Sequence, residues 1–456
     1  MTDPSFGTTE YFVRATRRLG VVAAVALGAA CVPGGLPQVS PEEIPELEAR
    51  LEREPANGEV MLRYGAALYA ADRCDSAIPV ARRGATLVPG DALGPMIQGQ
   101  CLEQSGDHVQ AIAIYTAFIR DHGQARGVAV VRARELMARR EQATILARTA
   151  LEREAELSAQ ALDPQTVAVL PLAISGDPQY QPLGRGLAQM LQSDLALLQQ
   201  FRMVERLQIG ALLDELELGQ TSRVDPTTVA RVGRLVRAGR MVQGLAAIPP
   251  DGDIRIEASI VQSDGEVTSP EFVTGRLRDL LQLEKELVVL ISSRLGYQLS
   301  LAERQMILGN GTRDLSAFLL YSRGLIAEDI GDYSAAATHF SSAMMADPSF
   351  RQAQVQYEAT AAADAVQGST PGQITSISRT VIQQPLATTV PDPVLNAVAS
   401  VVVDIAATQA ETTTSSSQGA EQQATTTTTA VPPPTTTATG TTATVTGVVR
   451  IIFKLP

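Results

Sequence analysis

The amino-acid sequence predicts a multidomain α+β protein in which helical hairpins flank a mixed α/β domain and a disordered tail rich in threonine and proline follows. Three observations predict this fold class. The chain has 456 residues, which is enough for two or three domains of ordinary size. Small residues repeat at a fixed spacing in the N-terminal part of the chain. In the central part, short apolar strands alternate with amphipathic helices.

The overall charge excludes one broad class of partner. A formal net charge of −12 and a pI near 4.9 argue against nucleic-acid binding, because phosphate contacts require a positive patch. The chain has no tryptophan and few other aromatic residues, so platforms for stacking bases or sugars are scarce. We therefore expect no nucleic-acid partner.

Residues 1–31 have the pattern of a signal peptide. Arg14, Arg17 and Arg18 precede an apolar run over residues 19–30 that is too short to span a bilayer as a mature helix. The run ends in Leu27-Gly-Ala-Ala-Cys31, which resembles a lipobox, although glycine replaces the usual leucine three residues before the cysteine. Either Cys31 is acylated or the chain is simply cleaved after Ala30. Acylation predicts a lipid anchor on the periplasmic side of the outer membrane.

Two cysteines remain if Cys31 is modified. Cys74 and Cys101 form an even pair in an oxidising compartment, where a disulfide is permitted. They are equally compatible with two small, buried apolar residues. The sequence leaves both interpretations open.

Residues 41–160 contain a repeat of tetratricopeptide length. Gly65 and Gly99 are 99 − 65 = 34 residues apart, and the same spacing separates Ala77 from Ala111. In a tetratricopeptide hairpin, small residues at these positions allow the two helices to approach closely. After residue 124 the pattern gives way to a long charged helix, which we expect to cap the stack.

Residues 312–367 match the same template once more, as a single unit followed by another helix. Gly324, Gly331-Asp-Tyr333, Ala336 and Phe340 occupy the template positions. One isolated unit cannot bury both of its faces, so it must dock on something. The segment 348–367, the central domain and a partner protein are the three alternatives.

Residues 164–300 predict a mixed sheet covered by helices. Alternating apolar residues and the Asp264-Gly265 turn signal predict a hairpin, and leucine-rich stripes predict helices. The predicted strands are 167–170, 201–204, 241–247, 254–260 and 267–274, and the predicted helices are 183–198, 207–218, 226–236 and 280–295.

Residues 411–446 are dominated by threonine, serine, alanine and proline and predict a disordered linker, because such a segment cannot bury enough apolar area to offset ordering. The terminal tail, 447–456, contains the strand-like hexamer 448–453. This hexamer is either a tail that needs a partner's sheet edge or a strand of the chain's own sheet.

The central segment also resembles the CsgG family of envelope lipoproteins. The resemblance rests on Val167-Ala-Val-Leu-Pro171, Leu183-Gly-Arg-Gly-Leu-Ala188, Phe201-Arg-Met-Val-Glu-Arg206 and Leu212-Leu-Asp-Glu215. It implies a periplasmic α/β domain on an outer-membrane lipoprotein, with Gly184 and Gly186 in a tight strand-to-helix turn. It does not by itself imply a pore.

Candidate catalytic and metal-binding patterns are weak. His108, His122 and His339 lack His-x-x-x-His spacing, and we expect structural roles for His108 and His339 at their repeat positions. Ser175 has no nearby base in the sequence, and the Asp214-Glu215 pair is expected on a solvated helix face. We expect no enzyme activity, no cofactor and no metal site.

These observations predict a non-enzymatic periplasmic lipoprotein that acts as a protein-binding scaffold or assembly factor in envelope biogenesis or secretion. Its helical-repeat groove would bind envelope proteins, and a homo-oligomer is left open. The alternative is a CsgG-type secretion pore subunit. The short Ala247–Ile254 connection and the charges at Arg255 and Glu257, which alternate with apolar residues, favour a globular domain over a pore.

Overall fold

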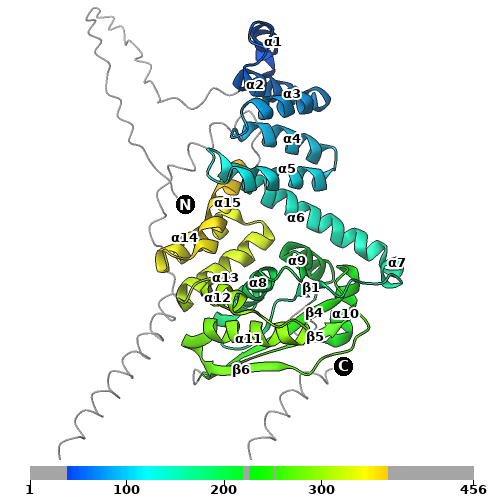
Figure 1. The fold of residues 1–456 in the computed structure, drawn as a ribbon, viewed down its shortest axis with the longest axis vertical. Helices are drawn as coiled ribbons and strands as arrows, with labels where there is room; N and C mark the ends of the chain where they lie inside the picture. The colour runs from blue at the N-terminus through cyan, green and yellow to red at the C-terminus, as the bar shows by residue number, and fades with distance from the viewer. Residues whose placement is uncertain (1–38, 219–224, 251–252, 368–456) are drawn as a thin grey trace, which may run out of the picture.

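The computed structural model describes residues 39–218, 225–250 and 253–367 (Figure 1). It shows an N-terminal arm of stacked helices, a central sheet domain, and three further helices that pack back against both. The predicted α+β class is confirmed. The signal peptide, Cys31, the linker 411–446 and the tail 447–456 lie outside the described residues.

The arm contains two helix pairs, α2–α3 and α4–α5, whose bounds follow the 34-residue period to within one residue. Its helices are α1 (Ile44–Arg53), α2 (Gly58–Ala70), α3 (Cys74–Leu87), α4 (Leu93–Gln104), α5 (His108–Asp121), α6 (Val128–Glu152) and α7 (Glu154–Ser158). A Cβ at Gly99 would overlap the ring of Tyr115, which is fully buried. In the C-terminal unit, a Cβ at Gly324 would likewise overlap the ring of Phe340. The small residues therefore allow helix contact, as the repeat pattern predicts.

The long helix α6 connects the arm to the sheet domain. It begins after Gly127, whose positive φ of 85° favours glycine, and runs for 25 residues. Its first half packs against α5, and its later turns pack against α9 of the sheet domain (Figure 1). The predicted cap of the repeat stack is thus also a bridge.

The central sheet has the strand order β3-β1-β4-β5-β6. β2 also pairs with β4, on the same edge as β1 and further along the strand. Its strands are β1 (Thr166–Val169), β2 (Ala173–Gly176), β3 (Arg202–Met203), β4 (Arg240–Ile248), β5 (Asp253–Gln262) and β6 (Glu271–Arg276). β1 pairs in parallel with β3 and β4, and β2 pairs in parallel with β4. β5 pairs antiparallel with both β4 and β6. The sheet is therefore mixed, as predicted.

Helices cover both faces of this sheet. They are α8 (Leu183–Ala196), α9 (Arg206–Glu215), α10 (Pro226–Leu235), α11 (Leu280–Arg294) and α12 (Leu301–Gly309). One apolar core joins the sheet to α8 and α11, and a second joins its other face to α9 and α10. Ala168 and Val169 point into different cores, as neighbouring residues in a strand do.

The C-terminal helices are α13 (Leu315–Ile330), α14 (Tyr333–Ala346) and α15 (Arg351–Val366). α13 packs against α8 of the sheet domain, whereas α15 packs against α6 of the arm. Gly186 lies where α13 crosses α8, and a Cβ there would come within 3.0 Å of Phe318 Cζ. Two of the three docking alternatives thus apply together: α13–α14 dock on the following helix and on the central domain.

The structure corrects three details of the sequence interpretation. Gly184 and Gly186 lie inside the first turn of α8, not in the turn before it, and they are needed for close approach rather than for a positive φ. The strand predicted over 267–274 begins only at Glu271, with Val267 forming an isolated bridge to Val261. β2 and α12 were not predicted.

Candidate protein-binding cleft

A cleft lies where the arm, the sheet domain and the C-terminal helices meet. It has a volume of about 440 Å³. Its walls come from α5, α6, α8, the start of α9, the end of α13, and α15; we call it the junction cleft. It is lined by Ile119, Arg132, Glu135, Leu136, Arg139, Gln189, Gln192, Glu205, Arg206, Leu207, Glu328, Val355, Gln356 and Ala359.

The charged groups of the junction cleft are paired across its walls. Arg132 Nη1 lies 2.5 Å from Glu358 Oε2, which joins α6 to α15. Arg139 Nη2 lies 2.8 Å from Glu135 Oε1, and Arg139 also pairs with Glu205 of the sheet domain. Because these charges are mutually satisfied, the cleft does not present a strong field of one sign.

The remaining lining combines amides with partly exposed apolar side chains. Gln189, Gln192 and Gln356 offer both a donor and an acceptor, which is what an extended backbone requires. Leu136 is partly buried, and Val355 is 44% exposed, so apolar surface lies beside these amides. A surface of this kind suits a peptide or helix from another protein.

Three arginines converge on the C-terminal end of α13 and form what we call the α13 clamp. Arg185 of α8 and Arg206 of α9 both pair with Asp329, and Arg206 also pairs with Glu328. Arg140 of α6 donates from Nε to the Asp329 carbonyl and from Nη2 to the Ile330 carbonyl, both at 3.0 Å. Cations at a helix C-terminus satisfy its free carbonyls and oppose its dipole. The clamp therefore ties arm and sheet domain to the same helix end.

Burial dominates the electrostatics of the clamp. It lowers the pKa of Arg185 to about 10, against the opposing attraction of Asp214 and Glu328. It also lowers the pKa of Arg206 and raises the pKa of the Glu328 carboxyl, while Arg206 opposes the latter effect. These groups remain paired because an isolated buried charge would cost far more than the pair.

A second buried ionic cluster lies between α8 and α11. Lys285 Nζ is 2.6 Å from Asp194 Oδ2 and 3.1 Å from Glu284 Oε2, and all three side chains are at most 7% exposed. Asn310 Nδ2 donates to Asp194 Oδ1 at 2.6 Å. Burial raises the pKa of Glu284 to about 8, with Lys285 opposing the shift and Asp194 adding to it.

The structure joins Cys74 of α3 to Cys101 of α4 in a disulfide, with their Cα atoms 5.4 Å apart. Ser175 lies exposed on β2, and Glu215 pairs with Arg148 of α6 at 2.8 Å. Asp214 lies near Arg185. Both carboxylates are exposed, as expected for a solvated helix face, and they also lie beside α6 and the clamp.

The Glu205-Arg206 step has a larger role than the sequence suggested. The step stands at the start of α9, where Arg206 pairs with Glu328 of α13 and Glu205 pairs with Arg139 of α6. Glu328 and Asp329, the partners of Arg206, lie just before the repeat motif at Gly331. Nothing in their local sequence distinguishes them from a solvated helix end. The α13 clamp was therefore missed.

Family comparison bears on the central domain. Residues 161–246 match the CsgG family. The family is described as the curli production assembly/transport component CsgG, and the matched segment runs from before β1 into β4. The predicted resemblance is confirmed over this segment.

Among solved structures, the LpoB C-terminal domain from Salmonella enterica is similar to this chain with 13% sequence identity and a TM-score of 0.21. The similarity covers 29% of this chain and 94% of that chain. A search of curated proteins found no match. Within the described residues, none of the helices has the length and apolar character needed to cross a membrane.

Proposed function

We propose that this chain is a non-enzymatic scaffold of the bacterial envelope that binds a protein segment in the junction cleft. The observation that carries the proposal is the position of the cleft, where helical repeats and a CsgG-matching domain supply opposite walls. The CsgG match supports an association with the envelope. Cys31, as a lipid anchor, would place the chain on the periplasmic side of the outer membrane.

The lining favours binding over catalysis. Around the cleft, Arg132, Arg139 and Arg206 are each engaged by a carboxylate, so their charges stabilise the junction itself. The amides and apolar side chains between them match the needs of a peptide backbone and its side chains. This arrangement supports recognition of an extended or helical segment.

The name of the matched family, an assembly/transport component, raises the alternative of a pore subunit. The longest strands, β4 and β5, lie in a sheet whose two faces are packed against α10 and α11. This packing favours the scaffold. Heat-stable oligomers in purified outer membranes, together with single-channel conductance, would instead support the pore.

Site-specific photo-cross-linking in intact cells tests the scaffold proposal. A photoreactive residue is placed at Gln192 or at Gln356 in the cleft, and at exposed Gln282 on α11 as the matched control. The proposal predicts that both cleft positions give the same discrete protein adduct and that Gln282 does not. Identical adduct patterns at all three positions, or no adduct from either cleft position, would contradict it.

A further inference from the structure

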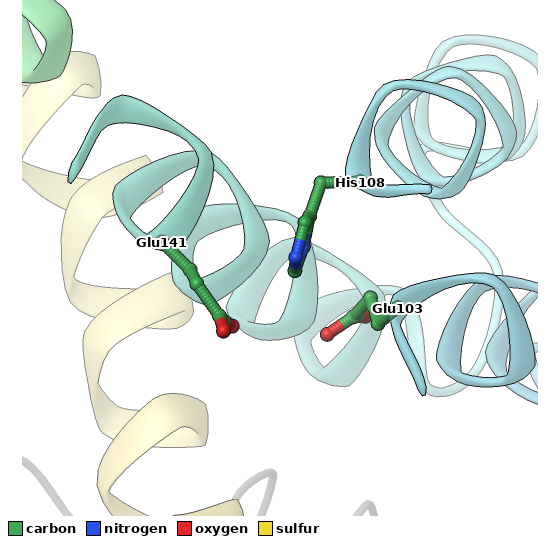
Figure 2. Close-up of side chains that lie close together, drawn as sticks. All are labelled: Glu103, His108 and Glu141. Carbon is green, nitrogen blue, oxygen red and sulfur yellow. The ribbon is translucent and has the colours of Figure 1, made fainter. Parts of the chain in front are cut away.

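Three potential metal ligands converge where α4, α5 and α6 meet. They are Glu103 near the end of α4, His108 at the start of α5 and Glu141 in α6. Figure 2 shows the His108 ring pointing into the space between the two carboxylates. One ligand atom from each residue lies within 4.8 Å of the others. No metal-binding spacing is visible in the sequence, because α5 and part of α6 separate Glu141 from Glu103 and His108 along the chain.

His108 has an unexplained polar atom. The residue is only 7% exposed, and its Nδ1 has no hydrogen-bond partner among the described residues. Leaving a buried nitrogen unpaired costs roughly 1–3 kcal/mol. Buried polar groups normally have a partner, so an unpartnered nitrogen on a ring that lies between two carboxylates (Figure 2) indicates a bound group.

The donor set fits zinc. Zn²⁺ accepts imidazole nitrogen and carboxylate oxygen at about 2.0–2.2 Å, usually with four tetrahedral ligands. At such bond lengths tetrahedral ligand atoms lie roughly 3.4 Å apart. The three ligand atoms lie within 4.8 Å of one another, so modest side-chain rotations would bring them to this spacing. Glu141 is exposed and lines a cavity of about 370 Å³ with Glu103, which gives an ion and a water ligand a path to the site.

The neighbouring arginines are already engaged. Arg134 donates from Nε to Glu103 Oε1 at 3.1 Å and from Nη2 to Glu103 Oε2 at 2.5 Å, and Tyr115 Oη donates to Oε1 at 2.6 Å. Each carboxylate oxygen has two lone pairs, and metal-ligating carboxylates are themselves commonly hydrogen-bonded. Arg134 thus holds Glu103 in place. Arg140 is directed to the end of α13, and Arg148 pairs with Glu215.

We propose that Glu103, His108 and Glu141 bind one Zn²⁺ ion, with water completing its coordination. The ion links α4 and α5 of the second repeat to α6. Because α6 carries both the wall of the junction cleft and the contact with α9, zinc fixes the arm relative to the sheet domain. The site is separate from the peptide-binding surface and does not depend on it.

Zinc titration of the full-length protein tests this site. The protein is stripped with a chelator and kept without reductant, so that Cys74 and Cys101 remain paired and supply no thiols. Zn²⁺ is then titrated against a chromophoric chelator. The wild type binds one ion per chain, and Glu141→Gln and His108→Gln weaken binding at least about tenfold. The control Glu152→Gln, at an exposed position of α6, leaves the affinity unchanged.

Two further readouts identify the ligands. Zinc raises the melting temperature of the wild type and of Glu152→Gln but not of Glu141→Gln, because a ligand of the folded state stabilises it. X-ray absorption of the zinc-loaded protein shows one imidazole among oxygen ligands. Glu141 is exposed, so Glu141→Gln leaves the fold intact and the comparison remains decisive if His108→Gln misfolds. Equal affinity in Glu141→Gln and Glu152→Gln, or no stoichiometric binding by the wild type, overturns the proposal.

Discussion

Glu284 shows how a single buried side chain makes stability depend on pH. Its carboxyl lies beside Asp194 and Lys285, at 1% exposure, and burial raises its pKa from 4.5 to about 8. An acid whose pKa is raised on folding binds its proton more tightly in the folded state than in the unfolded state. The folded chain therefore loses stability as pH rises from about 4.5 through about 8.

We predict that Glu284→Gln removes this loss. Between about pH 5 and about pH 8, the free energy of unfolding of the variant should rise relative to the wild type by an amount on the order of a few kcal/mol. Urea unfolding at a series of pH values measures the difference. Glu286→Gln, exposed on the same helix, should follow the wild type. Parallel pH profiles for wild type and Glu284→Gln would show that Glu284 does not titrate in this window.

The Cys74–Cys101 disulfide is a second feature of single residues that affects stability. It links α3 to α4 across a sequence separation of 27. Closing a loop of this length stabilises a protein by about 3 kcal/mol, chiefly by restricting the unfolded chain. Cys74→Ser/Cys101→Ser should lose about this much in oxidising buffer. If the wild type and the double variant have the same unfolding free energy without reductant, the cysteines are unpaired in the protein.

Close helix crossings decide the arrangement of elements. Gly186 of α8 faces Phe318 and Ser322 of α13, and both of those residues are fully buried. The family resemblance implied a tight strand-to-helix turn at Gly184 and Gly186. Gly186 instead allows contact with a helix more than a hundred positions away, which local patterns do not encode.

Gly186→Ala should therefore destabilise the chain by about 1–3 kcal/mol through overpacking. Gly309→Ala is the matched control, because a Cβ there meets nothing within 4 Å and alanine favours helix. Denaturant unfolding should show a loss only for Gly186→Ala. Equal stability of the two variants would mean that α13 does not lie against α8 as described.

Predictability from sequence depended on whether a feature repeats locally. The 34-residue period predicted helical hairpins, and the alternating apolar residues of β5 predicted a strand, because burial on one face spaces apolar residues regularly along the sequence. β2 was missed because Ala-Ile-Ser-Gly is too short to show alternation. Arg206 and Glu328 are 122 positions apart, and His108 and Glu141 meet only through helix packing. The fold was therefore more predictable than the sites.

At the scale of the whole molecule, the α13 clamp joins parts of the chain that the sequence presents as separate. Arg206 is 10% exposed and pairs with Glu328, which is fully buried, and with Asp329. Removing one member of a buried pair leaves an uncompensated charge and costs about 3–5 kcal/mol. Arg202 instead forms an exposed pair with Asp163, at 76% and 40% exposure.

Arg206→Gln should accordingly destabilise the protein by about 3–5 kcal/mol, whereas Arg202→Gln should cost less than about 1 kcal/mol. Hydrogen exchange should show the loss of protection in Arg206→Gln extending to α13 and the start of α9. Comparable unfolding free energies for the two variants would argue that the clamp does not hold the parts together.

Binding of the cross-linked partner to cleft variants tests whether the junction cleft is the binding surface. Val355→Asp places a charge in the junction cleft, and Val109→Asp makes the same change on α5, at a position that is 66% exposed and outside the cleft lining. The measurement is the dissociation constant of the partner identified by cross-linking, for each purified variant. We predict at least about tenfold weaker binding for Val355→Asp and wild-type affinity for Val109→Asp. Wild-type affinity for Val355→Asp, or equal weakening in both variants, would contradict it.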